Sequence, residues 1–455
     1  MDFELIKKYN IQGPRYTSYP TAIQFRETDE KDISDLQGYL LKRNSKPHSL
    51  SLYFHIPFCF SLCWYCGCTK IITKDTDRSD TYLAYVEKEM DMMARLIHPK
   101  SEVVQVHFGG GTPTFLKPDQ LHQLGELIHD RFNLTEETEF GVEIDPRRCT
   151  QEHIKALAEI GCNRASLGVQ DTNEEVQKAI HRIQPFKQTY RVTNWLREAG
   201  IHSINFDLIY GLPKQTLKTF RQTMDDVLSL APDRMAVYSY AHIPGLMPAQ
   251  KLLNVKDMPS TDEKLRMFKD SIEYLTIKGY RFIGMDHFSK KDEELAIAEQ
   301  NATLQRNFQG YSTRAGADLY AFGMSGISNV GSWYWQSRKD IRGYYESLYE
   351  EEFPVSKFYT LSKDDLIQKG VIMNIMCRMG VDFNDVSTKW GINFTGYFWN
   401  ELMHLKELEN DHLVTITDNG IHIEETGRLF LRNIAMCFDC YLNESQKEHQ
   451  FSKTV

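Results

Sequence analysis

The stretch LYFHIPFCFSLCWYCGC, residues 52–68, joins a short apolar segment to a loop that is rich in cysteine. Aromatic and aliphatic side chains dominate the segment 52–56, which predicts a buried strand. The loop holds Cys59, Cys63, Cys66 and Cys68, four of the nine cysteines of the chain. Their clustering indicates a site that needs several thiolates close together, directly after a strand.

Five further segments of the same character follow along the chain. The six predicted strands are LYFHI (52–56), VVQVHF (103–108), EFGVEI (139–144), RASLGVQ (164–170), INFDLIY (204–210) and RMAVYSY (234–240). Helix-like stretches lie between them, for example residues 79–97 and 118–132. Strictly alternating strands and helices predict an α/β fold with a parallel sheet. Six units of this size favour a partial (β/α)6 TIM-like barrel, with a doubly wound open sheet as the alternative.

Glycine and polar residues stand where each predicted strand ends. They are Gly109, Gly110 and Gly111 after the second strand, Glu143 and Asp145 at the third, Gln170 and Asp171 at the fourth, Asp207 in the fifth, and Ala241 and His242 after the sixth. In βα barrels the active site is built at this carboxyl edge from several strands. We therefore expect these residues to lie near the cysteine loop.

The chain changes character after the sixth unit. Residues 279–288 predict one more strand, and the glycine-rich, apolar segment 306–328 is expected to pack against the barrel mouth. Beyond residue 355, amphipathic helices and a hairpin with its turn at Asp418-Asn419-Gly420 predict a mostly helical C-terminal domain. We expect four parts: a lead-in arm (1–45), the barrel (46–290), a segment closing the mouth (291–355) and the C-terminal domain (356–455). Helices with a hairpin resemble a winged helix, but their mixed charge favours a structural cap over a DNA-binding module.

The composition of the 455 residues is that of an ordinary globular protein. A net charge of -9 gives the chain no general attraction to nucleic acid or to an anionic membrane. The first twenty residues lack a signal-peptide pattern, and no apolar run reaches the length of a membrane span. We expect a cytoplasmic protein, and a monomer. In a reducing compartment, clustered cysteines indicate metal binding or catalysis and not disulfides.

The spacing of the cysteine loop narrows its chemistry. Structural zinc commonly takes two separated pairs of ligands, which fits a single C-x3-C-x2-C-x-C knot poorly, and a redox C-x2-C pair is a second alternative. Three thiolates on one loop can instead hold three irons of a [4Fe–4S] cluster. The fourth iron then remains open to a chelating molecule, and one of the four cysteines is surplus.

The loop resembles the C-x3-C-x2-C signature of the radical S-adenosylmethionine (SAM) enzymes. More widely, the chain resembles the oxygen-independent coproporphyrinogen III oxidase family from about residue 5 to its end. The segments that carry this resemblance are GPRYTSYPTA (13–22), SLYFHIPFC (51–59), CWYCGCTKIIT (63–73), HFGGGTPTF (107–115), VEIDPR (142–147), LGVQD (167–171), DLIYGLPKQT (207–216), YAHIP (240–244), FIGMDHF (282–288), RNFQGYST (306–313) and MCFD (436–439).

The resemblance implies roles for individual residues. Cys59, Cys63 and Cys66 match the cluster ligands, so Cys68 is the surplus thiol. Tyr53, Gly110, Glu143 and Ile327 match contacts to the SAM at the cluster, whereas Tyr65, Gly111, Thr112, Gln170, Arg182, Asp207 and Ala241 match contacts to a second SAM. Tyr53, Glu143 and Arg182 are the expected catalytic residues. Arg15, Arg306 and Gln309 are candidates for the substrate. Without the resemblance, Glu143 and Arg182 would be ordinary surface charges and Gln309 a buried structural amide.

The family's reaction converts two propionates of coproporphyrinogen III into vinyl groups, which gives protoporphyrinogen IX and two CO2. A 5′-deoxyadenosyl radical, formed from SAM by one electron from the cluster, removes a hydrogen atom from the propionate. The resemblance also implies an electron donor such as flavodoxin or ferredoxin. The alternatives are a related radical SAM enzyme that processes haem, a haem chaperone of the same superfamily, and a zinc-holding interaction protein. We interpret Cys437 and Cys440 as core cysteines, and Cys149, Cys162 and Cys377 as structural.

Overall fold

The structure is a computed structural model that describes residues 3–442 and 451–454. All six predicted strands are present, as β2 (Leu50–Ile56), β5 (Glu102–Gly110), β6 (Asn133–Ile144), β7 (Arg164–Gln170), β8 (Ser203–Tyr210) and β9 (Arg234–Ser239). Each pairs in parallel with the next along the chain. A doubly wound sheet would reverse this order near its middle. The uninterrupted order of the six strands therefore confirms the partial barrel.

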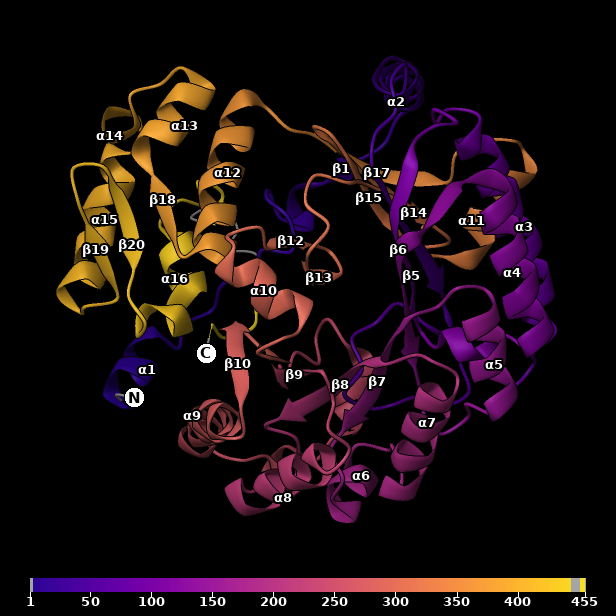
Figure 1. The fold of residues 1–455 in the computed structure, drawn as a ribbon, viewed down its shortest axis with the longest axis horizontal. Helices are drawn as coiled ribbons and strands as arrows, with labels where there is room; N and C mark the ends of the chain where they lie inside the picture. Colours follow the sequence, from indigo (N-terminus) through magenta and orange to yellow (C-terminus); the bar gives the residue numbers. More distant parts are fainter. Residues whose placement is uncertain (1–2, 443–450, 455) are drawn as a thin grey trace.

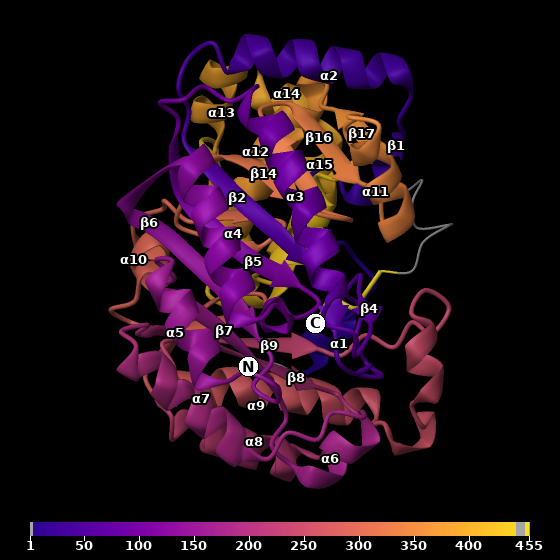
Figure 2. The same cartoon turned by 90° about the vertical axis from the view of Figure 1, so that its right-hand side faces the viewer.

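Helices cover the outer face of the curved sheet (Figures 1 and 2). They are α3 (Arg78–Ala94), α4 (Pro118–Arg131), α5 (Gln151–Glu159), α6 (Glu174–Ala179), α7 (Phe186–Glu198) and α8 (Leu217–Leu228). In β8 the buried residues alternate with less buried ones. Because successive strand side chains point to opposite faces, Ile204 and Phe206 pack in the core, while Asn205 and Asp207 line a cavity inside the barrel. The alternation therefore places one face of β8 in the hydrophobic core and the other face toward the cavity.

The sheet continues beyond β2. The strand β14 (Asp318–Phe322) pairs in parallel with β2, and β15 (Ile327–Val330), β16 (Trp333–Ser337), β17 (Val355–Thr360) and β1 (Arg26–Glu27) follow in antiparallel pairs. The sequence places residues 306–328 against the barrel mouth, yet β14 is buried along its whole length and extends the sheet itself. Near this end of the sheet, α11 (Ile341–Tyr349) packs against α3.

At the other end of the sheet the sequence-based prediction of one strand over 279–288 is wrong. The segment forms a hairpin of β10 (Tyr280–Gly284) and β11 (His287–Lys290), and β11 pairs with β9. Gly284 and Met285 both have positive φ, at 148° and 53°, and this reverses the chain inside an apolar run. The helices α9 (Thr261–Ile277) and α10 (Glu294–Gln300) flank this hairpin, and a small hairpin of β12 (Gln305–Asn307) and β13 (Gly310–Ser312) follows.

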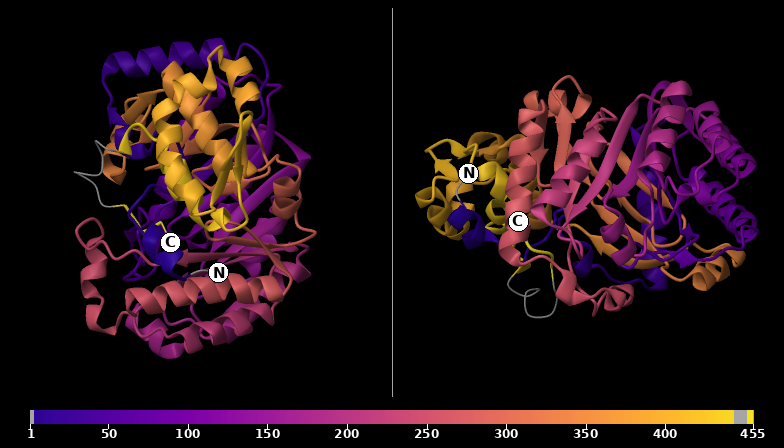
Figure 3. Two further views of the ribbon diagram at one scale, coloured as in Figure 1. Left: turned by 90° about the vertical axis from the view of Figure 1, so that its left-hand side faces the viewer. Right: turned by 90° about the horizontal axis from the view of Figure 1, so that it is seen from below.

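The C-terminal domain has the predicted helices and hairpin (Figure 3). Its elements are α12 (Lys363–Arg378), β18 (Gly380–Asp382), α13 (Phe383–Trp390), α14 (Phe394–Tyr397), α15 (Trp399–Asn410), β19 (Val414–Ile416), β20 (Gly420–Ile423) and α16 (Leu431–Met436). The sequence analysis missed β18, which pairs with β20 to give a three-stranded sheet. Cys149, Cys162 and Cys377 are buried as predicted, but Cys440 is exposed and Cys437 half-buried, so the core interpretation is wrong for Cys440.

Both ends of the described chain lie beside the C-terminal domain (Figure 1). The helix α1 (Phe3–Tyr9) precedes an extended arm, and α2 (Glu30–Arg43) leads to β2. Gln12 in the arm forms an antiparallel bridge with Lys453 near the C-terminus. Among the described residues, no helix combines the length and apolarity that crossing a membrane requires.

Candidate functional site: the cysteine loop and the barrel cavity

The cysteine loop leaves the carboxyl end of β2 and is closed by a short parallel pair, β3 (Phe58–Cys59) with β4 (Ile71–Ile72). Cys59 Sγ lies 3.4 Å from Thr112 Oγ1, which follows the glycine triplet of β5. The Cys66 N–H donates to the Cys63 carbonyl at 3.2 Å, which folds the loop back on itself. These contacts hold the three predicted cluster ligands at the edge where β2 and β5 end.

Two arginines make the surroundings of Cys63 cationic. Arg147 Nη2 lies 3.4 Å and Arg182 Nη1 lies 3.6 Å from Cys63 Sγ. Asp145 bonds both guanidinium groups. Burial disfavours its charge, but Arg182 and Arg147 outweigh burial and lower the pKa of Asp145 to about 2. Two guanidinium groups therefore lie against the Cys63 sulfur and share one carboxylate.

The thiols of the loop are compared with the donor pattern of a single metal ion and with that of a cluster. Over the described ranges, no group of three or more His, Cys, Asp or Glu side chains is arranged to hold one metal ion. A single tetrahedral zinc requires all its ligands around one point. In a [4Fe–4S] cube each thiolate binds its own iron, so the three thiolates need not meet at one point. Cys59, Cys63 and Cys66 fit that donor pattern.

Cys68 differs from the other three cysteines of the loop. It is exposed, whereas Cys63 is buried and Cys59 and Cys66 are half-buried. A hydrogen bond from the Cys68 side chain lowers the pKa of Cys66. Lys70 Nζ donates to the carbonyls of Cys66 and Cys68, at 3.2 and 3.1 Å. Cys68 therefore lies beside Cys66 on the solvent side of the loop.

The glycine triplet allows the backbone of β5 to approach the loop closely. A Cβ atom at Gly110, whose φ is +113°, would lie 2.7 Å from the His55 ring. One at Gly111 would lie 2.6 Å from the Pro57 carbonyl oxygen. The Gly111 N–H also donates to the Ile56 carbonyl at 2.8 Å. Only glycine fits at these two positions, so the edge of β5 remains bare backbone beside the cysteine loop.

Several polar residues lie around Glu143 at the end of β6. Its carboxylate accepts the Gly110 N–H at 3.2 Å and lies 3.4 Å from His107 Nε2. The Tyr53 ring stacks on His107, with centroids 6.0 Å apart, and Tyr53 Oη lies 3.1 Å from His55 Nδ1. The structure thus brings Tyr53, Gly110 and Glu143 together. The sequence analysis missed the two histidines, which stand in β2 and β5 with the alternation expected of cavity residues.

Several residues expected at a second SAM also lie close together. Gln170, with a φ of +68°, ends β7 at a bulge in its pairing with β8. A Cβ at Gly168 would lie 2.8 Å from Gln170 Nε2 and 3.2 Å from Arg182 Nη2, so both side chains converge there. Backbone strain and bulges of this kind gather at functional sites.

Gln250, which the sequence analysis missed, connects two other members of that set. Its Nε2 donates to the carbonyls of Tyr65 and Ala241, at 3.3 and 3.1 Å. The contacts of Ile327, in β15, lie elsewhere: it packs against the cluster of Phe25, Tyr334 and Leu361. Gln250 therefore joins Tyr65 and Ala241, whereas Ile327 belongs to the extension of the sheet and packs there.

Asp207 lies inside the barrel within a small hydrogen-bonded group. Its carboxylate accepts from Ser166 Oγ at 2.9 Å and from Asn205 Nδ2 at 2.9 Å. Burial raises the pKa of Asp207 to about 6. The carboxylate borders a cavity of about 140 Å³ that Glu143, His107 and Gln309 also line.

The cavity contains buried polar atoms without a partner among the described residues. Both amide atoms of Gln309 and Nδ1 of His287 are in this state, and Nη1 of Arg306, whose guanidinium lies over the ring of the lining residue Tyr311, is a further example. Buried polar groups are normally hydrogen-bonded, so this set is suited to bind a ligand or water. Arg306 Nε donates to the Arg15 carbonyl at 3.3 Å, and Arg15 pairs with Asp286. The three residues expected at the substrate thus lie near one wall of the barrel.

Comparison with known proteins identifies the family. Residues 53–227 match the radical SAM superfamily model and residues 361–430 match the HemN C-terminal domain model. The oxygen-independent coproporphyrinogen III oxidases of Salmonella typhimurium and Escherichia coli are 43% and 41% identical to the chain, over all of it and 98% of each relative. The solved structure of the coproporphyrinogen III oxidase (HemN) from Escherichia coli, described as a radical SAM enzyme, superposes with a TM-score of 0.92 at 40% identity over 97% of this chain and 99% of that one. The chain belongs to the oxygen-independent coproporphyrinogen III oxidase family of radical SAM enzymes.

Proposed function

We propose that this protein catalyses the oxidative decarboxylation of the ring A and ring B propionates of coproporphyrinogen III to vinyl groups without oxygen. The product is protoporphyrinogen IX. One observation carries this proposal: the loop of Cys59, Cys63 and Cys66 meets the bare backbone of Gly110 and the Glu143 carboxylate at one edge of the barrel. A cavity with unpaired polar atoms opens beside that edge.

The protein is a radical SAM enzyme and binds a [4Fe–4S] cluster and SAM. When bound, these groups supply a 5′-deoxyadenosyl radical that removes a hydrogen atom from the propionate β-carbon, and the substrate then loses CO2 and one electron to an acceptor. Cys59, Cys63 and Cys66 would hold the cluster. The Glu143 carboxylate and the Gly110 carbonyl are suited to the ribose hydroxyls and the amino group of SAM, and Tyr53 covers the same side.

A second SAM would contact Tyr65, Gly111, Thr112, Gln170, Arg182, Asp207 and Ala241. Arg182 offers a planar fork of donors that suits a carboxylate. Its Nε is buried without a partner among the described residues, which leaves a donor for a ligand. Asp207 is the acidic member of this set and is suited to a cationic or hydroxylated part of a ligand.

Arg15, Arg306 and Gln309 would contact the substrate. We also propose an electron donor such as flavodoxin or ferredoxin, a monomer in the cytoplasm, and the four-part division at residues 45, 290 and 355. With that division, the arm that carries Arg15 and the segment that carries Arg306 and Gln309 both belong to parts outside the barrel.

The test is anaerobic turnover of the reconstituted protein with coproporphyrinogen III, SAM and a reductant, with the products separated by chromatography. We expect protoporphyrinogen IX and two molecules of CO2 for each substrate molecule. Binding of haem without a decarboxylated product would favour the haem chaperone. Modification of haem without decarboxylation of coproporphyrinogen would favour the related haem-processing enzyme.

A further inference from the structure

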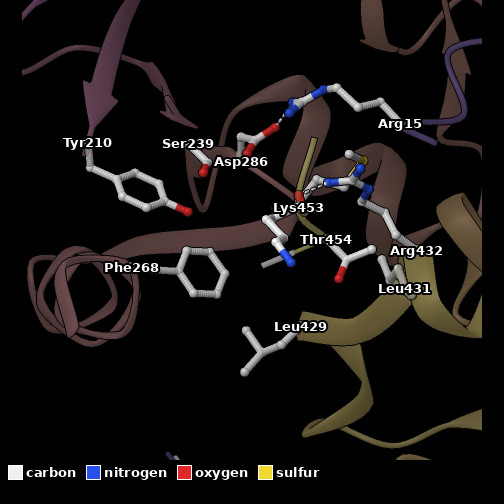
Figure 4. A pocket seen from close by; sticks show the side chains of 11 residues that line it. Arg15, Tyr210, Ser239, Phe268, Asp286, Leu429, Leu431, Arg432, Lys453 and Thr454 are labelled. Atoms are coloured by element: carbon white, nitrogen blue, oxygen red, sulfur yellow. Dashed lines mark hydrogen bonds and ion pairs between the residues drawn. The ribbon is translucent and has the colours of Figure 1, made fainter. Parts of the chain in front are cut away.

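A small pocket lies where the two ends of the chain meet the mouth of the barrel (Figure 4). Tyr210 and Ser239, the last residues of β8 and β9, form its barrel side. Arg15 from the N-terminal arm and Lys453 from the C-terminal tail form the other side. The pocket is therefore at the carboxyl edge of the barrel, where ligands of βα barrels bind.

Arg432 ties the two chain ends together at this place. Its Nε donates to the Pro14 carbonyl at 2.8 Å and its Nη1 to the Lys453 carbonyl at 2.6 Å. The Gly13 N–H donates to the Ser452 carbonyl at 3.1 Å. Because Lys453 is held through its backbone, its side chain is free of this anchoring role. Figure 4 shows the Arg15 side chain reaching Asp286 and the Lys453 side chain on the far side of that pair, with its ammonium group pointing away from Arg15.

The charges around the pocket are unbalanced. Arg15, Arg432 and Lys453 line it, and Arg306 adjoins it through the Arg15 carbonyl. Across the described parts of the chain, Asp286 is the carboxylate that pairs with these cations, through Arg15. Arg306 is nine-tenths buried, and its Nη1 has no partner there. Positive charge gathered in partly buried surroundings is costly unless an anion compensates it.

The family's substrate supplies such an anion. Coproporphyrinogen carries four propionates, and two of them remain ionised throughout the reaction. Both need cationic partners away from the atoms that react. The pocket lies close to the reacting edge, since Ala241 of the proposed second SAM site is two residues beyond Ser239. The Arg15–Asp286 pair also adjoins the barrel cavity, because Arg15 stacks over Tyr238, which lines that cavity, at 5.6 Å.

We propose that Arg15 and Lys453 bind a propionate of the tetrapyrrole that is not oxidised, and that Asp286 occupies Arg15 until the substrate displaces it. This inference rests on the proposed function. It gives the C-terminal tail a part in substrate binding. It also makes Asp286 an internal competitor of the substrate and not a residue that helps to bind it.

The test is a fluorescence titration of the holoenzyme with coproporphyrin III, which keeps the four propionates but does not turn over, and with its tetramethyl ester. We expect Lys453→Ala to weaken binding of the acid about tenfold, the size of one charge-assisted contact. Binding of the ester should not change. Lys100→Ala, an exposed lysine beside the start of β5, is the matched control and should bind like the wild type. Removing the competitor in Asp286→Asn should tighten binding of the acid several-fold.

Unchanged binding in Lys453→Ala, or weaker binding in a folded Asp286→Asn protein, would overturn the subsite. Near-ultraviolet circular dichroism and the cluster absorbance report whether each variant is folded. Failure of the proposed function is seen separately, in the turnover assay. If Lys453→Ala weakens binding of the acid but the wild type gives no vinyl product, the subsite stands and the proposed function is wrong. If the wild type turns over but Lys453→Ala binds the acid unchanged, the function stands and the subsite is wrong.

Discussion

The two edges of the barrel use arginine in opposite ways. At the amino edge, Arg164 at the start of β7 meets Glu139, Glu293 and Glu294, at 3.5, 3.5 and 2.7 Å. Arg234 at the start of β9 also pairs with Glu293. At the carboxyl edge, Arg147 and Arg182 share the single carboxylate Asp145 beside a thiol.

The difference between the two edges shows where a ligand has to supply negative charge. The ion pairs at the amino edge compensate one another's charge without a ligand, although Nε and Nη1 of Arg164 and Nη2 of Arg234 make no hydrogen bond among the described residues. Surplus cations at the carboxyl edge cost free energy until thiolates, a SAM carboxylate or substrate propionates compensate them. The two edges therefore differ in charge balance, although Glu139, Arg164 and Arg234 line the same cavity as Glu143 and Asp207.

Removing a cluster ligand at the carboxyl edge should have the largest effect on iron content and turnover of all the substitutions considered. We expect Cys63→Ala to abolish both the brown cluster absorbance and turnover, because the thiolate between Arg147 and Arg182 is lost. Cys377→Ala, a buried thiol of the C-terminal domain, should keep both. Absorbance spectra and iron content of the anaerobically reconstituted proteins are the measurements. A cluster that survives in Cys63→Ala would show that the ligand assignment is wrong.

The sequence predicts those parts of the molecule that depend on local pattern. Apolar runs marked all six parallel strands, and the motif spacing marked the cysteine loop. The hairpin at Gly284 escaped because its turn residues, Gly284 and Asp286, stand in a stretch whose apolar residues otherwise read as one strand. The pairing of β14 with β2 joins residues more than 250 positions apart, which no local signal reports.

The missed site residues have the same explanation. Arg147, Gln250 and His287 gain their roles from contacts with distant segments, and each looks like an ordinary polar residue in its own stretch. The one signal available was position, because His55 and His107 alternate with core residues in β2 and β5. Alternation in a strand that ends at a site is therefore worth as much attention as the loop that follows it.

At the amino edge we expect a large effect on stability and a small one on chemistry. Arg164→Leu leaves Glu139 and Glu293 buried with less compensation, and breaking such a pair costs about 4 kcal/mol. Urea denaturation should show this loss, while turnover per folded molecule stays near that of the wild type. Lys155→Ala removes an exposed pair with Glu159 and should cost less than about 1 kcal/mol. A large loss of turnover in folded Arg164→Leu would erase the distinction between the edges.

Asp207, a buried carboxyl group inside the barrel, should make the stability of the protein depend on pH. Burial raises its pKa to about 6, so between about pH 4 and pH 6 the folded protein keeps a proton that the unfolded chain has released. The free energy of unfolding should therefore fall as the pH rises through about 6, by up to about 3 kcal/mol. Asp207→Asn should lose that part of the pH dependence. Urea denaturation of both proteins at several pH values measures it, and equal slopes would contradict the burial of an ionisable carboxyl at this position.

The smallest expected effect separates two thiols of the same loop. Cys63 is buried between two arginines, whereas Cys68 is exposed beside Cys66. If the arginines mark the side on which thiolates bind iron, Cys68→Ser should keep the iron content and absorbance of the wild type, with at most a modest change in turnover. If Cys68 were a ligand, no iron would be left for SAM, and Cys68→Ser would lose iron as Cys63→Ala does. Iron analysis of the two variants side by side therefore decides whether the cationic side of the loop, and not the number of sulfurs, defines the cluster site.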